Sequence, residues 1–139
     1  MAAAAIFAVS CNKPANGGDD DVIGDDITQG REVDDAMAGA EVWSIIGAFC
    51  DWGEGEINMT KVSDNPEKWF AGSVGLTEGE WKFRGNHEWG VYDLGAGGAA
   101  FIPGVVLDLK AANGNINCTE DATYEITLYP TLKCCIIKK

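Results

Sequence analysis

Apolar and polar residues alternate most regularly over residues 80–84, directly after a glycine. Trp81 and Phe83 fall on one side of an extended chain, while Lys82 and Arg84 fall on the other. This follows because successive side chains of a strand point to opposite faces of a sheet. One face is therefore bulky and apolar, as a core requires, and the other carries two long hydrogen-bond donors. The alternation predicts a strand with one buried face.

Shorter runs of similar patterning recur along the chain, separated by glycine or by pairs of Asn and Asp. Such punctuation at short intervals is typical of an antiparallel sandwich. No segment has the periodicity of a long helix, although one helical turn fits residues 34–40. The sequence therefore predicts an all-β, immunoglobulin-like antiparallel β-sandwich. We expect strands over residues 42–46, 56–60, 67–74, 80–84, 89–93, 104–109, 115–118, 123–129 and 133–137.

Large apolar residues at alternating positions mark the expected core. Tyr124, Ile126 and Leu128 share one face of a predicted strand. Residues 105–107 are apolar without alternation, which fits either a strand buried on both faces or an interface with another chain. The chain has five tryptophans, and we expect three of them in the core: Trp43, Trp69 and Trp81.

The chain carries a formal net charge of −12 at pH 7. Half of that charge falls between residues 12 and 38, where eight acidic residues stand against two basic ones. The stretch is rich in Asp, Gly and Asn and poor in aromatic residues, which predicts a disordered acidic tether. Because so little of the chain could neutralise phosphates, nucleic-acid binding is not expected.

The first ten residues determine the expected compartment. Residues 1–9 are mostly small and apolar, and Ser10 and Cys11 follow them. This pattern resembles a bacterial lipoprotein signal, which is cut before a cysteine that then carries lipid, and it is too short to span a bilayer. We expect a signal peptide over 1–10, lipidation of Cys11, a lipid-anchored acidic linker over 11–40, and a β domain over 41–139. The alternative is an ordinary hydrophobic N-terminus with a chance cysteine.

The remaining cysteines are Cys50, Cys118, Cys134 and Cys135. The two adjacent ones should point to opposite faces of a strand, so we expect at most one of them inside. The spacing does not fit paired CxxC zinc motifs, and His87 is the only histidine, so no metal site is expected. Buried free thiols are the default expectation, with one disulfide as the alternative.

Several short motifs resemble one known family in their order and spacing. They are Val42-Trp43-Ser44-Ile45-Ile46-Gly47, Trp52, Met59-Thr60, Trp69, Lys82-Phe83-Arg84 followed by Trp89, Gly114-Asn115-Ile116-Asn117, and residues 123–128. Over residues 41–139 this set resembles the domain of SusE/SusF-like outer-membrane glycan (starch)-binding lipoproteins of the Bacteroidota. The resemblance implies a surface sandwich that works beside an outer-membrane glycan transporter. Residues 99–113 form a longer and more apolar insertion than that family leads us to expect.

The resemblance implies that Trp52, Lys82 and Trp89 help to form a sugar platform. Flat aromatic surface beside hydrogen-bond donors suits a sugar ring, whose C–H face packs on an indole and whose hydroxyls need partners. We add three residues to the candidate glycan-binding site, because their side chains are expected to point to the same outer face and to reach a ligand there: Arg84, Asn86 and Tyr92. The alternative is that the two loop tryptophans pack against the domain's own surface.

We therefore expect non-catalytic binding of an α-glucan-like polysaccharide on the outer face of the outer membrane, with no cofactor. The choice of α-glucan comes from the resemblance alone. The main alternative is a structural or interaction lipoprotein of a surface assembly that binds no glycan. An enzyme ranks third, because the sequence shows neither the paired-carboxylate context of a glycosidase nor a nucleophile-elbow motif.

Overall fold

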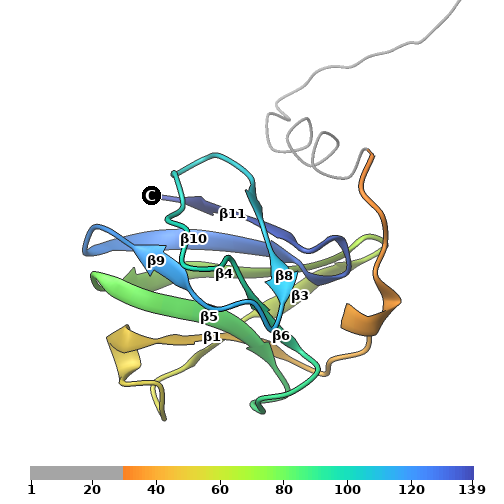
Figure 1. The fold of residues 1–139 in the computed structure, drawn as a ribbon, viewed down its shortest axis with the longest axis horizontal. Coiled ribbons are helices and arrows are strands. Elements are labelled where there is room, and N and C mark those ends of the chain that lie inside the picture. The colour runs from red at the N-terminus through yellow and green to blue at the C-terminus, as the bar shows by residue number, and fades with distance from the viewer. Residues whose placement is uncertain (1–29) are drawn as a thin grey trace, which may run out of the picture. The chain divides into compact units, whose positions relative to one another are not determined.

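Two antiparallel sheets enclose one core in the computed structural model, which describes residues 30–139 (Figure 1). The first sheet has the order β2-β1-β5-β6-β8, and β9 also pairs with β5. The second sheet has the order β3-β4-β10-β11-β7. This arrangement confirms the predicted all-β, immunoglobulin-like antiparallel sandwich. The expected signal peptide (1–10) and Cys11 lie outside the described residues.

Most strands are short, and the three longest are β4, β5 and β10. The first sheet contains β1 (Trp43–Gly47), β2 (Ile57–Asn58), β5 (Gly79–Gly85), β6 (Asp93–Gly95), β8 (Lys110–Ala111) and β9 (Ile116–Cys118). The second contains β3 (Thr60–Asp64), β4 (Glu67–Leu76), β7 (Leu107–Asp108), β10 (Ala122–Tyr129) and β11 (Cys134–Lys138). Three single 3-10 turns complete the described part: η1 (Asp35–Met37), η2 (Ala48–Cys50) and η3 (Pro130–Leu132).

The core between the sheets follows the predicted facing of the strands. Trp81 and Phe83 are buried on the inner face of β5, with their rings edge to face at 5.1 Å between centroids. The predicted facing of β10 is confirmed as well, although the pairing of β10 with β4 shifts register between Tyr124 and Ile126. The buried predicted core residues are Trp43, Trp69, Trp81, Tyr124, Ile126 and Leu128.

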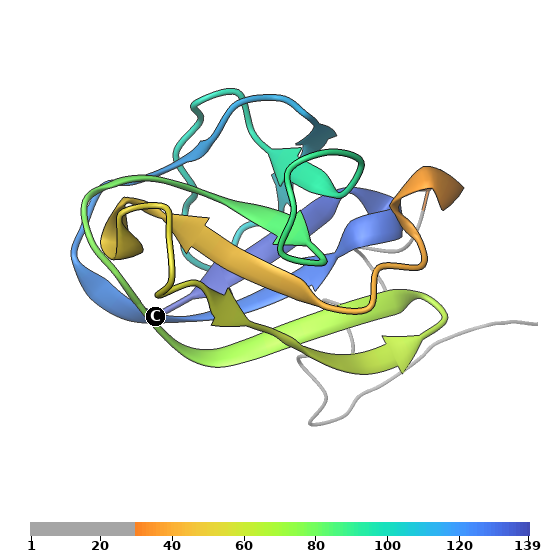
Figure 2. The ribbon, with the colours of Figure 1, turned by 90° about the horizontal axis from the view of Figure 1, so that it is seen from below.

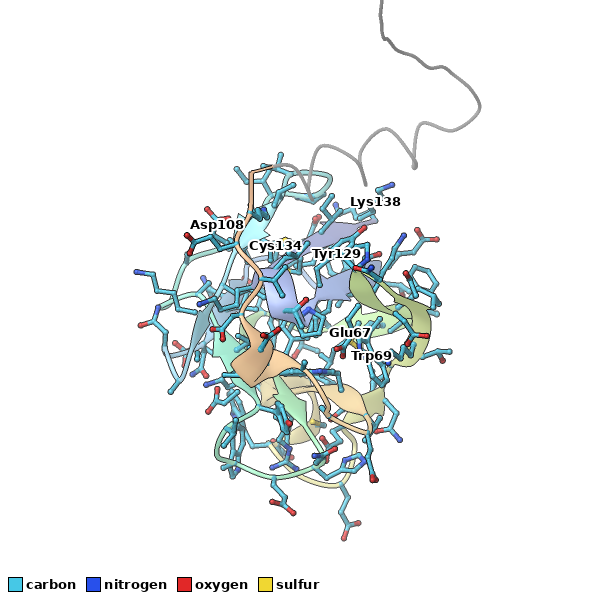
Figure 3. All side chains as sticks on the ribbon, turned by 90° about the vertical axis from the view of Figure 1, so that its right-hand side faces the viewer. Glu67, Trp69, Asp108, Tyr129, Cys134 and Lys138 are labelled. Atoms are coloured by element: carbon cyan, nitrogen blue, oxygen red, sulfur yellow. The ribbon has the colours of Figure 1, made fainter. Side chains whose placement is uncertain are left out.

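A buried carboxylate satisfies one of the core indoles. Glu67 and Trp69 lie next to each other along β4, as Figure 3 shows. The indole Nε1–H of Trp69 donates a hydrogen bond of 2.8 Å to Glu67 Oε2. Because a buried polar group without a partner is costly, this bond accounts for an acidic residue at the start of a central strand.

Residues 99–113 complete the core rather than forming a separate lobe. Phe101 is buried, and its ring meets Tyr124 and Trp81 edge to face, at centroid distances of 5.2 and 6.1 Å. Beyond it, the backbone N–H of Val105 donates to the carbonyl of Ile102, closing a turn. Gly104 takes a positive φ of 83° in that turn. Val105 is 51% exposed, so residues 105–107 do not form a strand buried on both faces. Of the strand expected over 104–109, only β7 (Leu107–Asp108) forms.

The strand expected over residues 89–93 was also wrong. Asn86 and His87 both adopt positive φ, and Gly90 does so at 156°. These conformations turn the chain away from β5 before it can pair again. Strand pairing resumes only at Asp93, the first residue of β6.

The folded unit begins at Val33, before the expected boundary at residue 41. The helical turn expected within 34–40 is present as η1, and its Met37 is buried. The backbone N–H of Asp34 donates to the carbonyl of Thr131 at 2.7 Å, and its carboxylate pairs with Lys133 at 3.0 Å. The last residues assigned to the linker over 11–40 therefore belong to the folded unit, because their apolar side chains pack into it.

Both adjacent cysteines of β11 are buried, but, as expected, they point to opposite faces and only one of them lies inside the core between the sheets. Cys135 faces the core between the sheets. Cys134 faces outward, but it lies between its strand partners Tyr129 on β10 and Asp108 on β7 (Figure 3). Burial raises the pKa of the Cys135 thiol well above its usual value. All four cysteines of the described part are free thiols.

Replacing Phe83 by alanine should lower the free energy of unfolding by about 3–5 kcal/mol, because the ring is completely buried and leaves a cavity. Val62→Ala is the matched control on an exposed strand position, and we expect a change within about 0.5 kcal/mol. Urea denaturation of both variants measures the difference. Equal effects would show that β5 does not present Phe83 to the core.

Candidate functional site

Two loops fold back over the outer face of the first sheet and bring two tryptophans together. Figure 2 shows the loop after β1 and the loop after β5 leaving opposite ends of these antiparallel strands. The first loop carries Trp52, which is 36% exposed, and the second carries Trp89, which is 51% exposed. Their ring centroids lie 6.3 Å apart with an angle of 44° between the planes. The two indoles thus form a joined aromatic surface, which we call the tryptophan pair.

The backbone at Trp52 adopts a conformation that a bulky residue rarely takes. Asp51 and Trp52 have φ values of 52° and 59°. The turn is closed by a hydrogen bond from Gly53 N to Cys50 O, and Trp52 N donates to Gly47 O at 2.9 Å. A left-handed conformation costs about 1–2 kcal/mol for a residue with a Cβ. Glycine is the residue that best tolerates this backbone conformation. The tryptophan at position 52 is therefore locally unfavourable.

An ion pair lies beneath the tryptophan pair. The Arg84 guanidinium donates to both carboxylate oxygens of Glu56, at 2.8 and 3.1 Å. Ser44, which is fully buried, donates its hydroxyl to Glu56 at 2.5 Å, and His87 Nδ1 lies 3.1 Å from the same carboxylate. Burial by itself raises the pKa of Glu56, but the hydrogen bonds from Arg84, Ser44 and His87 outweigh it and lower the pKa to about 2. Glu56 therefore stays ionised at neutral pH.

A second ion pair lies alongside the first. Lys82 forms an ion pair with Asp93, the first residue of β6, and only 6% of Lys82 is exposed. Lys82 lies on the outer face as predicted, but it is buried there, so the prediction that only one face of this strand is buried was wrong. The loops that carry the tryptophan pair cover this part of the sheet, and Ile46, the strand partner of Lys82, is also fully buried.

Both cations pack against the ring of Trp89. Arg84 Cζ lies 4.7 Å and Lys82 Nζ 5.8 Å from its centroid. Cation–π contacts of this kind contribute about 0.5–1 kcal/mol each at exposed sites. Lys82 and Arg84 thus support the indole, while their hydrogen-bonding groups are engaged by Asp93 and Glu56.

Asn86 and Tyr92 lie beside the tryptophan pair and make structural bonds. Asn86 Oδ1 accepts a hydrogen bond of 2.7 Å from the backbone N–H of Glu41. The Tyr92 hydroxyl donates to the carbonyl of Ala38 at 2.9 Å, and its ring packs edge to face on Trp43. The structure thus brings Trp52, Lys82, Arg84 and Trp89 into one cluster, while Asn86 and Tyr92 tie that cluster to the chain entering β1.

A shallow hollow opens next to Trp89. Its volume is about 130 Å³. Part of its wall is aromatic and part is the carboxylate-bearing Glu88, which is exposed. The lining residues are Gly85, Asn86, Glu88, Trp89, Gly90, Val91 and Tyr92.

Sequence reasoning missed four residues of this site: Ser44, Glu56, His87 and Asp93. One of them left a signal, because Ser44 is a polar residue inside the apolar run of β1 and faces opposite to Trp43 and Ile45. Nothing in the sequence indicates the role of Glu56, because that role depends on the path of the loop across the sheet. Within residues 30–139, no three His, Cys, Asp or Glu side chains gather in a way that could hold a metal ion.

Comparison of the chain with protein-family models, with curated proteins and with solved structures finds no match. Among the described residues, no helix has the length and apolar character needed to span a membrane. The resemblance to SusE/SusF-like lipoproteins stays a prediction.

The strain at Trp52 can be measured with two variants that both remove the indole. Trp52→Gly should be more stable than Trp52→Ala by about 1 kcal/mol, because only glycine adopts a positive φ without cost. The two variants lose the same ring contacts, so their difference in free energy of unfolding isolates the backbone term. If the alanine variant were the more stable one, Trp52 would not have a left-handed backbone.

Proposed function

We propose that the tryptophan pair is a non-catalytic binding surface for a saccharide chain. The observation that carries this proposal is the placement of Trp52: a large, partly exposed indole in a strained turn, set against a second exposed indole. Strained backbone persists where the surrounding structure imposes it, and it clusters at functional sites. An exposed apolar patch rimmed by polar residues is likewise a feature of binding surfaces.

The geometry fits a ligand with flat apolar faces. Ring stacking on an aromatic side chain contributes about 1–3 kcal/mol per ring, on the scale measured for nucleic-acid bases. Two stacked sugar rings would then give micromolar binding at best, after the loss of translational and side-chain freedom is subtracted. Weak single sites suit a protein that meets a polymer at many points and gains by avidity.

The ion pairs under the tryptophan pair hold the surface ready for a ligand. Because Lys82 and Arg84 are engaged by Asp93 and Glu56, they support Trp89 rather than offering free donors to a sugar. Hydroxyl groups of a ligand would instead meet exposed side chains of the loops, such as Asp51 and Glu88. Glu56 does not suit acid catalysis, since a general acid needs a raised pKa and that of Glu56 is lowered to about 2.

The wider role that we propose is capture of glycan at the cell surface for a neighbouring outer-membrane uptake system, with lipid anchoring through Cys11. The proposed α-glucan-like ligand and the transporter partner are supported by the resemblance of the motifs over residues 41–139. The composition of the first eleven residues supports the anchor.

A structural or interaction role without glycan binding is the second candidate. It is favoured by the turn between Ile102 and Val105, whose two apolar side chains are exposed. Two exposed apolar residues make a small surface compared with a stable protein interface, which buries about 800 Å² on each partner. We therefore rank this function below saccharide binding.

Affinity electrophoresis of the domain tests the proposed function. The gels contain an α-glucan, a β-glucan, a mannan or a chitin derivative. Trp89→Ala should abolish the retardation shown by the unmodified domain, because the variant removes the more exposed of the two indoles. Its melting temperature should stay within a few degrees, because the indole is half exposed.

Phe70→Ala is the matched control, since Phe70 is an exposed ring on the second sheet. It should leave the retardation unchanged. A stable domain that none of the four polysaccharides retards would contradict the proposal. A Trp89→Ala protein that unfolds would show instead that the indole is part of the core, and the saccharide surface would be rejected.

A further inference from the structure

The hollow beside Trp89 has walls of opposite chemical character. Trp89 and Tyr92 contribute aromatic residues to its lining, and Glu88, which is exposed, contributes an acidic residue to the same lining. A cavity of about 150 Å³ can take one benzene-sized molecule. At about 130 Å³, this hollow is slightly smaller but open, so it can take part of one sugar ring of a longer ligand while the rest of that ring faces solvent.

The charges around the hollow favour a cation. The two basic residues at the site are neutralised, since Lys82 pairs with Asp93 and Arg84 with Glu56. The loops that carry the tryptophan pair also present three exposed acidic residues: Asp51, Glu54 and Glu88. An anionic sugar would meet net repulsion here, while an ammonium group would gain both the carboxylate and the face of an aromatic ring.

We propose that this hollow is a subsite for a protonated amino sugar, such as a glucosamine residue of a partly deacetylated glycan. The inference rests on the proposed saccharide-binding function and specifies the class of sugar. In the bound state the sugar ring lies along Trp89, and its ammonium group faces Glu88. Neutral sugars stack on the same indole without the charge contact, so they bind more weakly.

Titration calorimetry with three tetrasaccharides tests this subsite. The probes are a glucosamine tetramer, its fully N-acetylated counterpart and a glucose tetramer, at a pH where the amine is protonated. The unmodified protein should bind the glucosamine tetramer most tightly, and added salt should reduce that preference because it screens the charges. Glu88→Gln should weaken glucosamine binding roughly two- to fivefold, as expected for one exposed charge pair. It should change the other two affinities by less, because glutamine can still hydrogen-bond a sugar hydroxyl.

Glu125→Gln is the matched control, because it removes the same charge from an exposed position on β10 in the second sheet. This control separates a local contact from attraction to the net negative protein. Equal affinity for the three probes would overturn the subsite while leaving the saccharide surface in place. The subsite would also be overturned if Glu125→Gln reduced the preference for the glucosamine tetramer as much as Glu88→Gln does. Binding of none of the probes would refute the proposed function, and the subsite with it.

Discussion

Arg84 and Glu56 form the interaction on which the site depends. Their bidentate contact joins β5 to the loop after β1, Ser44 adds β1, and His87 adds the loop after β5. Two regions far apart in sequence, residues 44–56 and 84–87, therefore meet at one carboxylate. A partly buried carboxylate without a partner would be costly, so Glu56 has to stay beside Arg84. This requirement fixes the position of the loop that carries Trp52, because Glu56 belongs to the same loop. The low pKa of Glu56 expresses the same fact, because the surrounding donors favour the charged form.

The aromatic surface follows from that layer of charge. Trp89 lies on the paired cations and is thereby oriented, while Trp52 is placed by the hydrogen bonds of its strained turn. An indole held from beneath loses little side-chain freedom when a ligand stacks on it, which lowers the entropic cost of binding. The outer face of the first sheet is thus built in three layers: strand residues, ion pairs and exposed rings. Such an arrangement would be unusual for a face that only meets solvent.

Much of the fold could be predicted because strand facing is a property of a single segment. The alternation from Trp81 to Arg84 assigned inner and outer residues correctly, and Tyr124, Ile126 and Leu128 followed the same rule. Burial of the outer face could not be predicted in this way. Lys82 and Cys134 are covered by segments that come from elsewhere in the chain, and their placement depends on pairing between strands.

The candidate site was predictable to the extent that residue type alone indicates exposure. A tryptophan in a glycine-rich loop pointed to Trp52, and the motif with Lys82 and Arg84 pointed to Trp89. The partners of these residues were out of reach, since Glu56 and Asp93 meet them only through the loop path and the register of β6 with β5. Lys82 and Arg84, the donors expected for sugar hydroxyls, are instead paired with carboxylates and packed against the ring of Trp89.

The most direct measurement follows the five tryptophan indole N–H resonances by NMR while a soluble oligosaccharide is added to the domain. Each resonance is assigned by a single Trp→Phe variant. The account predicts that the signals of Trp52 and Trp89 move together and saturate, while those of Trp43, Trp69 and Trp81 stay in place because these indoles are buried. Shifts confined to the buried tryptophans, or no shift with any glucan or glucosamine oligomer, would contradict the central claim that the tryptophan pair is the binding surface.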